Sequence, residues 1–145
     1  MEINTNTLGP IEIDESRIIT FVKPLSGVEM GGSRYALLDL NPQSPVKLLQ
    51  SVEDAHICFL VGDPAILAPG YVVDTAPGDL TNLALAEESE AAVLVLLTVL
   101  GDANGMTTAN LKAPIIVNRF TLKAEQLILN GDKYPLRKPV VLQKG

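Results

Sequence analysis

Few residues of this chain could perform covalent chemistry, and the most suggestive pair is His56 with Cys58. On a strand spanning residues 56–61 their side chains would share a face, and a histidine beside a cysteine could act as the base that generates a thiolate nucleophile. No third group that would orient the histidine is recognisable. Because free cysteine is usually a small buried hydrophobe, we favour a structural role for the pair.

Carboxylates offer a second kind of chemistry. Asp63, Asp102 and the neighbours Glu53 and Asp54 could meet as general acid and base. Each of them lies beside turn residues, however, where aspartate is expected for its hydrogen bonds to the backbone. We therefore expect no catalytic residues.

Another group of carboxylates precedes the most apolar stretch of the chain, and its members are Glu87, Glu88 and Glu90. These side chains could hold a cation or dock a basic partner, although a solvated loop is the simpler interpretation.

Metal, cofactor and phosphate sites are not expected either. One Cys and one His cannot form an internal disulfide, nor can they supply the four nitrogen or sulfur ligands of a structural zinc ion. Gly31 and Gly32 are not followed by the Gly-Lys-Ser/Thr of a phosphate-binding loop.

The charge balance favours protein partners. Among 145 residues, 11 Lys and Arg oppose 17 Asp and Glu, so that the formal net charge is -6. Nucleic acids and anionic membranes are bound by clustered cations, which makes basic proteins the more natural partners here. The N-terminus lacks the cationic and apolar regions of a signal peptide, and we expect a cytoplasmic protein with a single domain over residues 1–145.

The elements that must position these residues centre on residues 91–100. This unbroken run, rich in Val and Leu, is typical of a strand with both faces covered, and it is too short for a membrane helix of roughly 20 residues. After a reversal at 101–105, a second apolar run begins at Pro114. We expect two buried strands beside a polar corner, where Asn110 and Asn118 either satisfy backbone groups or contact a partner.

The rest of the chain alternates short apolar runs with turn residues, which predicts further strands. We expect an edge hairpin from 2–4 and 11–13, strands at 17–22, 35–40, 46–51 and 56–61, and a tight hairpin from 127–129 and 133–136 around Asn130 and Gly131. A brief helix is expected after Asp79 and a frayed end from Arg137 onward. The prediction is an all-β protein, a small closed or nearly closed β-barrel of short antiparallel strands with at most one short helix.

Residues 97–99 and 108–118 also carry a recognisable motif. An aliphatic run ends in Thr-Val, and after a polar turn the chain reads Thr-Ala-Asn-Leu-Lys-Ala-Pro-Ile-Ile-Val-Asn. This block resembles the signature of the flagellar assembly factor FliW family. Further matching segments lie at 48–52, 59–64, 127–130 and 134–137. The loop Ser26, Gly27, Val28 and Glu29 departs from the family, which usually has proline and phenylalanine where Ser26 and Val28 stand.

The resemblance implies a non-catalytic cytoplasmic FliW-like β-barrel that binds flagellin and, in exchange, the RNA-binding translational repressor CsrA. Bound CsrA would be withheld from flagellin messenger RNA. The alternative is a small β-barrel enzyme or metabolite-binding domain using the polar corner around Asn110 and Asp102. Residues that match or adjoin the signature, together with the acidic group, are the candidate partner contacts: Asn110, Lys112, Pro114, Asn118, Arg119, Glu87, Glu88 and Glu90.

Overall fold

The computed structural model describes residues 1–23, 25, 32–39, 43–73, 80–85, 90–99 and 107–140. The strands are β1 (Glu2–Thr5), β2 (Gly9–Glu12), β3 (Ile19–Phe21), β4 (Arg34–Asp39), β5 (Val46–Ser51), β6 (Cys58–Gly62), β7 (Ala91–Val99), β8 (Thr107–Ala109), β9 (Ile115–Asn118), β10 (Lys123–Gln126) and β11 (Lys138–Val140). Short helical segments are η1 (Glu15–Arg17), α1 (Pro64–Leu67) and η3 (Thr81–Leu83).

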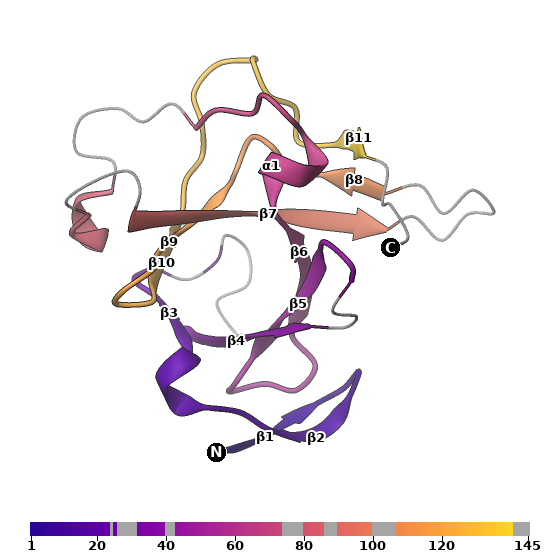
Figure 1. Ribbon diagram of the computed structural model, residues 1–145, viewed down its shortest axis with the longest axis vertical. Helices are drawn as coiled ribbons and strands as arrows, with labels where there is room; N and C mark the ends of the chain where they lie inside the picture. The colour runs from indigo at the N-terminus through magenta and orange to yellow at the C-terminus, as the bar shows by residue number, and fades with distance from the viewer. Residues whose placement is uncertain are drawn as a thin grey trace.

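A closed barrel forms the body of the molecule. Its strands follow the order β7-β6-β5-β4-β3-β10-β9, and β9 pairs again with β7, so that the sheet has no free edge around this ring (Figure 1). Every neighbouring pair is antiparallel except β3 with β10, which is parallel. The predicted all-β barrel with little helix is therefore confirmed, with one parallel pairing that the sequence did not indicate.

The long strand β7 has an apolar core on each of its faces. Ala92 and Leu94 pack against the barrel core, whereas Val95 and Leu97 belong to a second cluster outside the barrel. Successive side chains of a strand point to opposite faces, so a strand covered on both faces has no polar alternation. This arrangement explains the unbroken apolar run and confirms the expected central strand.

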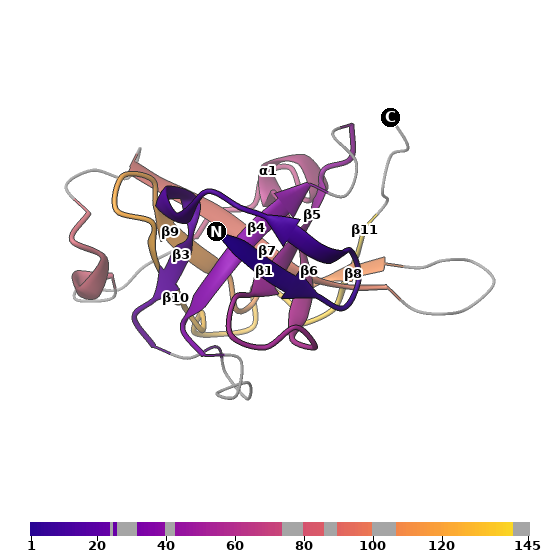
Figure 2. The same ribbon diagram turned by 90° about the horizontal axis from the view of Figure 1, so that it is seen from below.

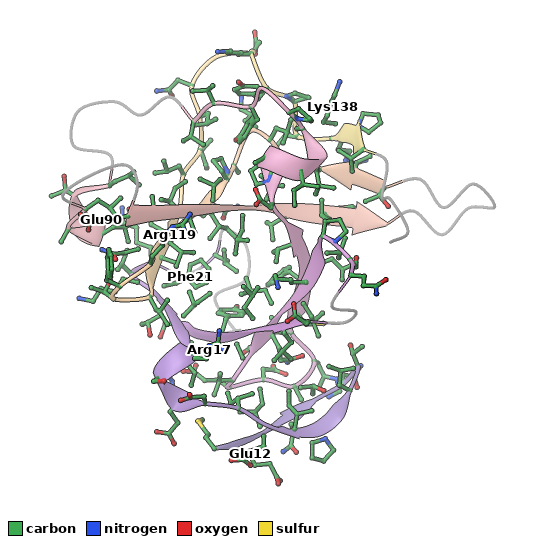
Figure 3. The ribbon with its side chains drawn as sticks, viewed as in Figure 1. Glu12, Arg17, Phe21, Glu90, Arg119 and Lys138 are labelled. Atoms are coloured by element: carbon green, nitrogen blue, oxygen red, sulfur yellow. The ribbon has the colours of Figure 1, made fainter. Side chains whose placement is uncertain are left out.

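Aromatic and aliphatic side chains fill the barrel. Phe21 points into its interior (Figure 3), and its ring meets the fully buried ring of Tyr35 edge-on with centroids 5.3 Å apart. Leu49, Val61 and Ile115 complete the centre of this core, and none of the three is exposed.

The second cluster lies between β7 and an outer layer of short segments. Leu67 of α1 and Ala68 directly after it pack against this cluster, and so do Tyr71, Tyr134 and Val140. The side chain of Leu67 from α1 lies directly over Gly62, where a Cβ atom would be 2.4 Å from Leu67 Cδ1 and would push that side chain aside. This layer covers the end of the molecule where α1, β8 and β11 lie (Figure 1).

The N-terminal hairpin is a separate two-stranded sheet of β1 and β2, as predicted. Figure 2 shows it crossing the barrel on the side of β4 and β5. Ile3 is buried, and the amide of Asn6 donates a 3.1 Å hydrogen bond to the carbonyl of Ala55.

The predicted hairpin at 127–136 is wrong. The amides of Leu127 and Leu129 donate instead to the carbonyls of Pro114 and Lys112, at 2.9 and 2.8 Å, and the segments on either side of Asn130 form no ladder with each other. Gly131 does adopt a positive φ of 82°. The pair of turn residues therefore bends the chain but does not reverse it, because the segments on both sides run antiparallel to the same stretch, first along residues 114–112 and then along 111–107.

The expected frayed end needs correction for residues 138–140, which form β11 and pair with β8. The backbone hydrogen bond expected of Asp63 is present: its carboxylate accepts a 2.9 Å hydrogen bond from the amide of Ala65, and with Pro64 in the first turn it begins α1. The helix expected after Asp79 is the short η3, and Asp79 itself lies outside the described residues.

Candidate functional site

The polar corner begins at Asn110, directly after β8. The Asn110 Oδ1 atom accepts hydrogen bonds from the amides of Lys112 and Ala113, at 3.2 and 3.1 Å. An asparagine that accepts two amides ahead of it turns the chain without a helix or a ladder. The half-buried side chain of Asn110 therefore shapes the loop that leads to Pro114, which is fully buried.

Lys112 lies on the outer side of the same corner. Its Nζ atom donates a 2.9 Å hydrogen bond to the carbonyl of Gly131. The amide of Leu111 bonds to the carbonyl of Pro135 at 3.1 Å. The corner is thus bound to the 127–136 segment, and only part of Lys112 remains available to a partner.

Asn118 ends β9 and is only 2% exposed. Its Nδ2 atom donates to the carbonyl of Leu83, while Oδ1 accepts from the amides of Phe120 and Thr121 at 2.9 and 3.2 Å. The side chain uses its donor and acceptor on the protein's own backbone. Asn118 therefore positions the turn that follows it rather than presenting itself at the surface.

That turn carries exposed side chains. Arg119 lies beside Glu90 at one end of β7 (Figure 3), and the Arg119 amide donates a 2.8 Å hydrogen bond to the Glu90 carbonyl. Phe120 is 77% exposed, more than any other large hydrophobic residue described. The sequence analysis missed Phe120, although an aromatic residue placed two positions after a turn-forming asparagine was the available signal.

Several predicted residues cannot be placed in this site. Glu87, Glu88 and Asp102 lie outside the described residues, as does the divergent loop from Ser26 to Glu29. The structure therefore brings Glu90 and Arg119 together, and it places Asn110, Lys112 and Pro114 at a separate corner.

The residues suited to covalent chemistry have local structural contacts. His56 is exposed and precedes β6, where its amide bonds to the Asp54 carboxylate at 2.9 Å, and Cys58 is half-buried. Glu53 pairs with Arg34 at 3.4 Å. Within the described part of the chain, no three His, Cys, Asp or Glu side chains gather as a metal site would require. These contacts do not support the enzyme alternative.

The charges of the described residues are separated along the molecule. Exposed carboxylates cluster at the N-terminal hairpin and η1: Glu2, Glu12, Asp14 and Glu15. Figure 3, drawn with the longest axis vertical, places Glu12 at one end and Lys138 at the other. Hydrogen bonds from the hydroxyl and amide of Ser16 hold the pKa of Asp14 below its ordinary value. Asp14 therefore keeps its negative charge to a lower pH than an ordinary aspartate.

Comparison with known proteins identifies the relatives of this barrel. The family described as FliW protein matches residues 2–140. The chain belongs to the FliW family. The flagellar assembly factor FliW of Bacillus velezensis is 40% identical over 134 residues, 92% of each chain. That of Thermosipho africanus is 34% identical over 137 residues, 94% of this chain and 93% of the relative.

The family also accounts for the architecture. A crystal structure of the flagellar assembly factor FliW superposes with a TM-score of 0.86 at 32% identity, covering 96% of each chain. The family resemblance predicted from the signature block is thereby confirmed, and with it the FliW barrel. No helix in the described parts of this FliW-family chain is long and apolar enough to cross a membrane.

Proposed function

We propose that this chain is a cytoplasmic, non-catalytic partner switch that binds the translational repressor CsrA and, alternately, flagellin. In the CsrA-bound state it keeps the repressor from flagellin messenger RNA, and accumulating flagellin releases the repressor again. Membership of the FliW family supports an assembly role. The acidic end of the molecule is the observation that supports a basic partner.

The acidic end suits a basic RNA-binding protein. Glu2, Glu12 and Glu15 are exposed on one hairpin and the adjoining η1, where Arg17 and the ammonium group of Met1 are the neighbouring cations. The Met1 ammonium lies 2.6 Å from Glu12 Oε1 and neutralises part of that charge. Complementary charge accelerates encounter more than it tightens the bound complex.

The residues around the signature are the second proposed contact area. Lys112, Arg119 and Glu90 are the members with accessible side chains. Asn110, Pro114 and Asn118 would act by shaping the loops that present those side chains. Glu87 and Glu88 remain candidate contacts beside Glu90.

Calorimetric titration with CsrA, repeated after saturation with flagellin, tests the proposal. We expect a dissociation constant of about micromolar or tighter, near -8 kcal/mol, and loss of the heat signal in the presence of flagellin. No heat and no co-elution at tens of micromolar would mean that the fold is shared but the partners are not.

A pair of charge reversals tests the acidic end. The double variant Glu2→Lys with Glu15→Lys should slow association with CsrA about tenfold at low ionic strength. Asp132→Lys reverses an equally exposed carboxylate in the 127–136 segment and should leave the rate near that of the wild type. The double variant changes the net charge by +4 and Asp132→Lys by +2, so an effect of Asp132→Lys about half as large in the logarithm of the rate would show that net charge, rather than this surface, governs the encounter.

A further inference from the structure

The outer layer over the second cluster exposes apolar side chains beside cations. Ile66, Val72, Ile128 and Leu136 are 61, 53, 66 and 59% exposed. The other exposed large hydrophobics among the described residues, Leu8 and Phe120, belong to the β1–β2 hairpin and the β9–β10 turn. We call Ile66, Val72, Ile128, Leu136, Arg137 and Lys138 the apolar-basic face.

Two segments distant in sequence are fixed to each other beneath this face. The rings of Tyr71 and Tyr134 meet edge-on with centroids 4.5 Å apart, and the amide of Val72 donates a 3.0 Å hydrogen bond to the Tyr134 hydroxyl. The Tyr71 hydroxyl donates in turn to the carbonyl of Leu111 at 2.6 Å. Both rings pack on the second cluster, so the face is organised before any partner arrives.

Among the described residues of this layer, the exposed cations Lys133, Arg137 and Lys138 outnumber the exposed carboxylates Asp63 and Asp132. Arg137 and Lys138 are exposed, and the Lys133 ammonium lies 5.3 Å from the centre of the Tyr134 ring. The 127–136 segment contains one carboxylate, that of Asp132. A protein with a net charge of -6 thus carries two exposed cations directly after the exposed Leu136.

We propose that the apolar-basic face binds a protein segment that combines apolar side chains with carboxylates. Exposed aliphatic side chains on segments that are fixed to each other, as those of Val72 and Leu136 are through Tyr134, are typical of an interaction site, and nearby cations select the sign of the partner's charge. Resting on the proposed function, this assigns flagellin to the apolar-basic face and leaves the acidic end to the basic repressor.

A model ligand tests the face independently of the proposed partners. The probe is a fluorescent amphipathic peptide of about 18 residues, or five helical turns, with leucine on one face and glutamate on the other. A peptide with lysine in place of glutamate is its control. The wild-type protein should bind the glutamate peptide at least about tenfold more tightly, measured by fluorescence anisotropy.

Variants locate the binding. Ile128→Ser with Leu136→Ser, and separately Arg137→Glu with Lys138→Glu, should each weaken peptide binding about tenfold or more. Leu8→Ser with Phe120→Ser, and Lys123→Glu with Arg17→Glu, are matched double changes at exposed positions outside the face and should have no effect, with circular dichroism confirming that every variant is folded. Equal binding of the two peptides, or equal affinities of face and control variants, would overturn the proposal.

Competing occupants give different results. If Leu136→Ser converts a self-associated wild-type protein to monomers, the face is an interface between copies of this chain. If the face variants abolish co-sedimentation with vesicles containing anionic phospholipid, its ligand is a membrane. Either result overturns the proposal.

The same variants separate this inference from the proposed function. Face variants should weaken the binding of flagellin about tenfold, while the affinity for CsrA changes less than about twofold. If the wild type binds neither protein but still selects the acidic peptide, the proposed function fails and the face stands. If both proteins bind and the face variants weaken neither of them, the face proposal fails and the function stands.

Discussion

The Nδ2 atom of Asn118 donates a 2.9 Å hydrogen bond to the carbonyl oxygen of Leu83, which joins the end of β9 to η3 across 35 residues of sequence. Both residues are almost completely buried, at 2 and 1% exposure. The Oδ1 atom of the same side chain holds the amides of Phe120 and Thr121. One asparagine therefore fixes both the η3 segment and the turn that exposes Arg119 and Phe120.

Asn118→Ala should lower the free energy of unfolding by about 3 kcal/mol, because it leaves buried donors and acceptors unpaired. Asn118→Asp retains the acceptor for the Phe120 and Thr121 amides, but it places a buried carboxylate oxygen against the carbonyl of Leu83, so it should be at least as destabilising as the alanine change. Urea denaturation monitored by circular dichroism measures both. An alanine variant as stable as the wild type would mean that water replaces these hydrogen bonds.

Asn110→Ala should reduce partner binding while the protein stays folded. The Oδ1 atom shapes the loop around Lys112 through two amide hydrogen bonds, and its loss should cost about 1 kcal/mol of stability. Asn110→Asp keeps both acceptor interactions and is the matched control. Calorimetric titration with CsrA and with flagellin compares the two variants. An alanine variant that fails to fold would assign Asn110 to the core.

The asparagines show how far the sequence alone could reach. Polar residues inside apolar runs signalled that Asn110 and Asn118 have a specific task, and their turn-forming chemistry favoured a structural one. Most of their partners are amides two and three residues ahead, but the partner of the Asn118 Nδ2 atom could not be predicted, because Leu83 lies 35 residues away in sequence. Burial of the Asn118 side chain depends on this long-range contact.

The strand predictions were likewise correct where a local pattern was sufficient and wrong where long-range pairing decides. The apolar run of β7 predicted a strand covered on both faces, and the local pattern was sufficient for that. The predicted hairpin at 127–136 was wrong because Asn130 and Gly131 favour a turn but do not specify the partners of Leu127 and Leu129. Those amides bond to Pro114 and Lys112 and so extend the pairing of β10 with β9, which the local turn residues could not indicate.

Tyr71→Phe should lower the free energy of unfolding by about 1 kcal/mol near neutral pH, because the carbonyl of Leu111 loses its 2.6 Å hydrogen bond. Burial, with the nearby Tyr134, raises the pKa of Tyr71 from 10.0 to about 12. The neutral phenol is favoured in the folded state, so its stabilisation is complete below pH 10 and is lost as the pH rises to about 12.

The stability difference between wild type and Tyr71→Phe should therefore shrink over that alkaline range. Burial also raises the pKa of Tyr35, but Tyr35 is present in both proteins and its contribution cancels in the difference. Urea denaturation from pH 8 to 12, with absorbance recording tyrosinate formation, provides the measurement. A difference that stays constant with pH would show that Tyr71 titrates normally.

Glu2→Lys should stabilise the protein while weakening its proposed encounter with CsrA. Glu2 faces Glu12 directly across the β1–β2 ladder, and like charges in opposing positions destabilise a sheet. The Met1 ammonium relieves only part of this repulsion, so the free energy of unfolding of the variant, measured by thermal unfolding at low salt, should rise by about 0.5 kcal/mol.

Glu2→Gln is the control, because it removes the repulsion without adding an attraction, and its stability should rise less. At about 1 M salt both gains should disappear, since exposed charges are then screened. Any affinity tag belongs at the C-terminus, so that the Met1 ammonium stays unmodified and keeps its contact with Glu12. Slower association despite higher stability would mean that this glutamate serves binding, whereas an unchanged rate would remove Glu2 from the acidic contact.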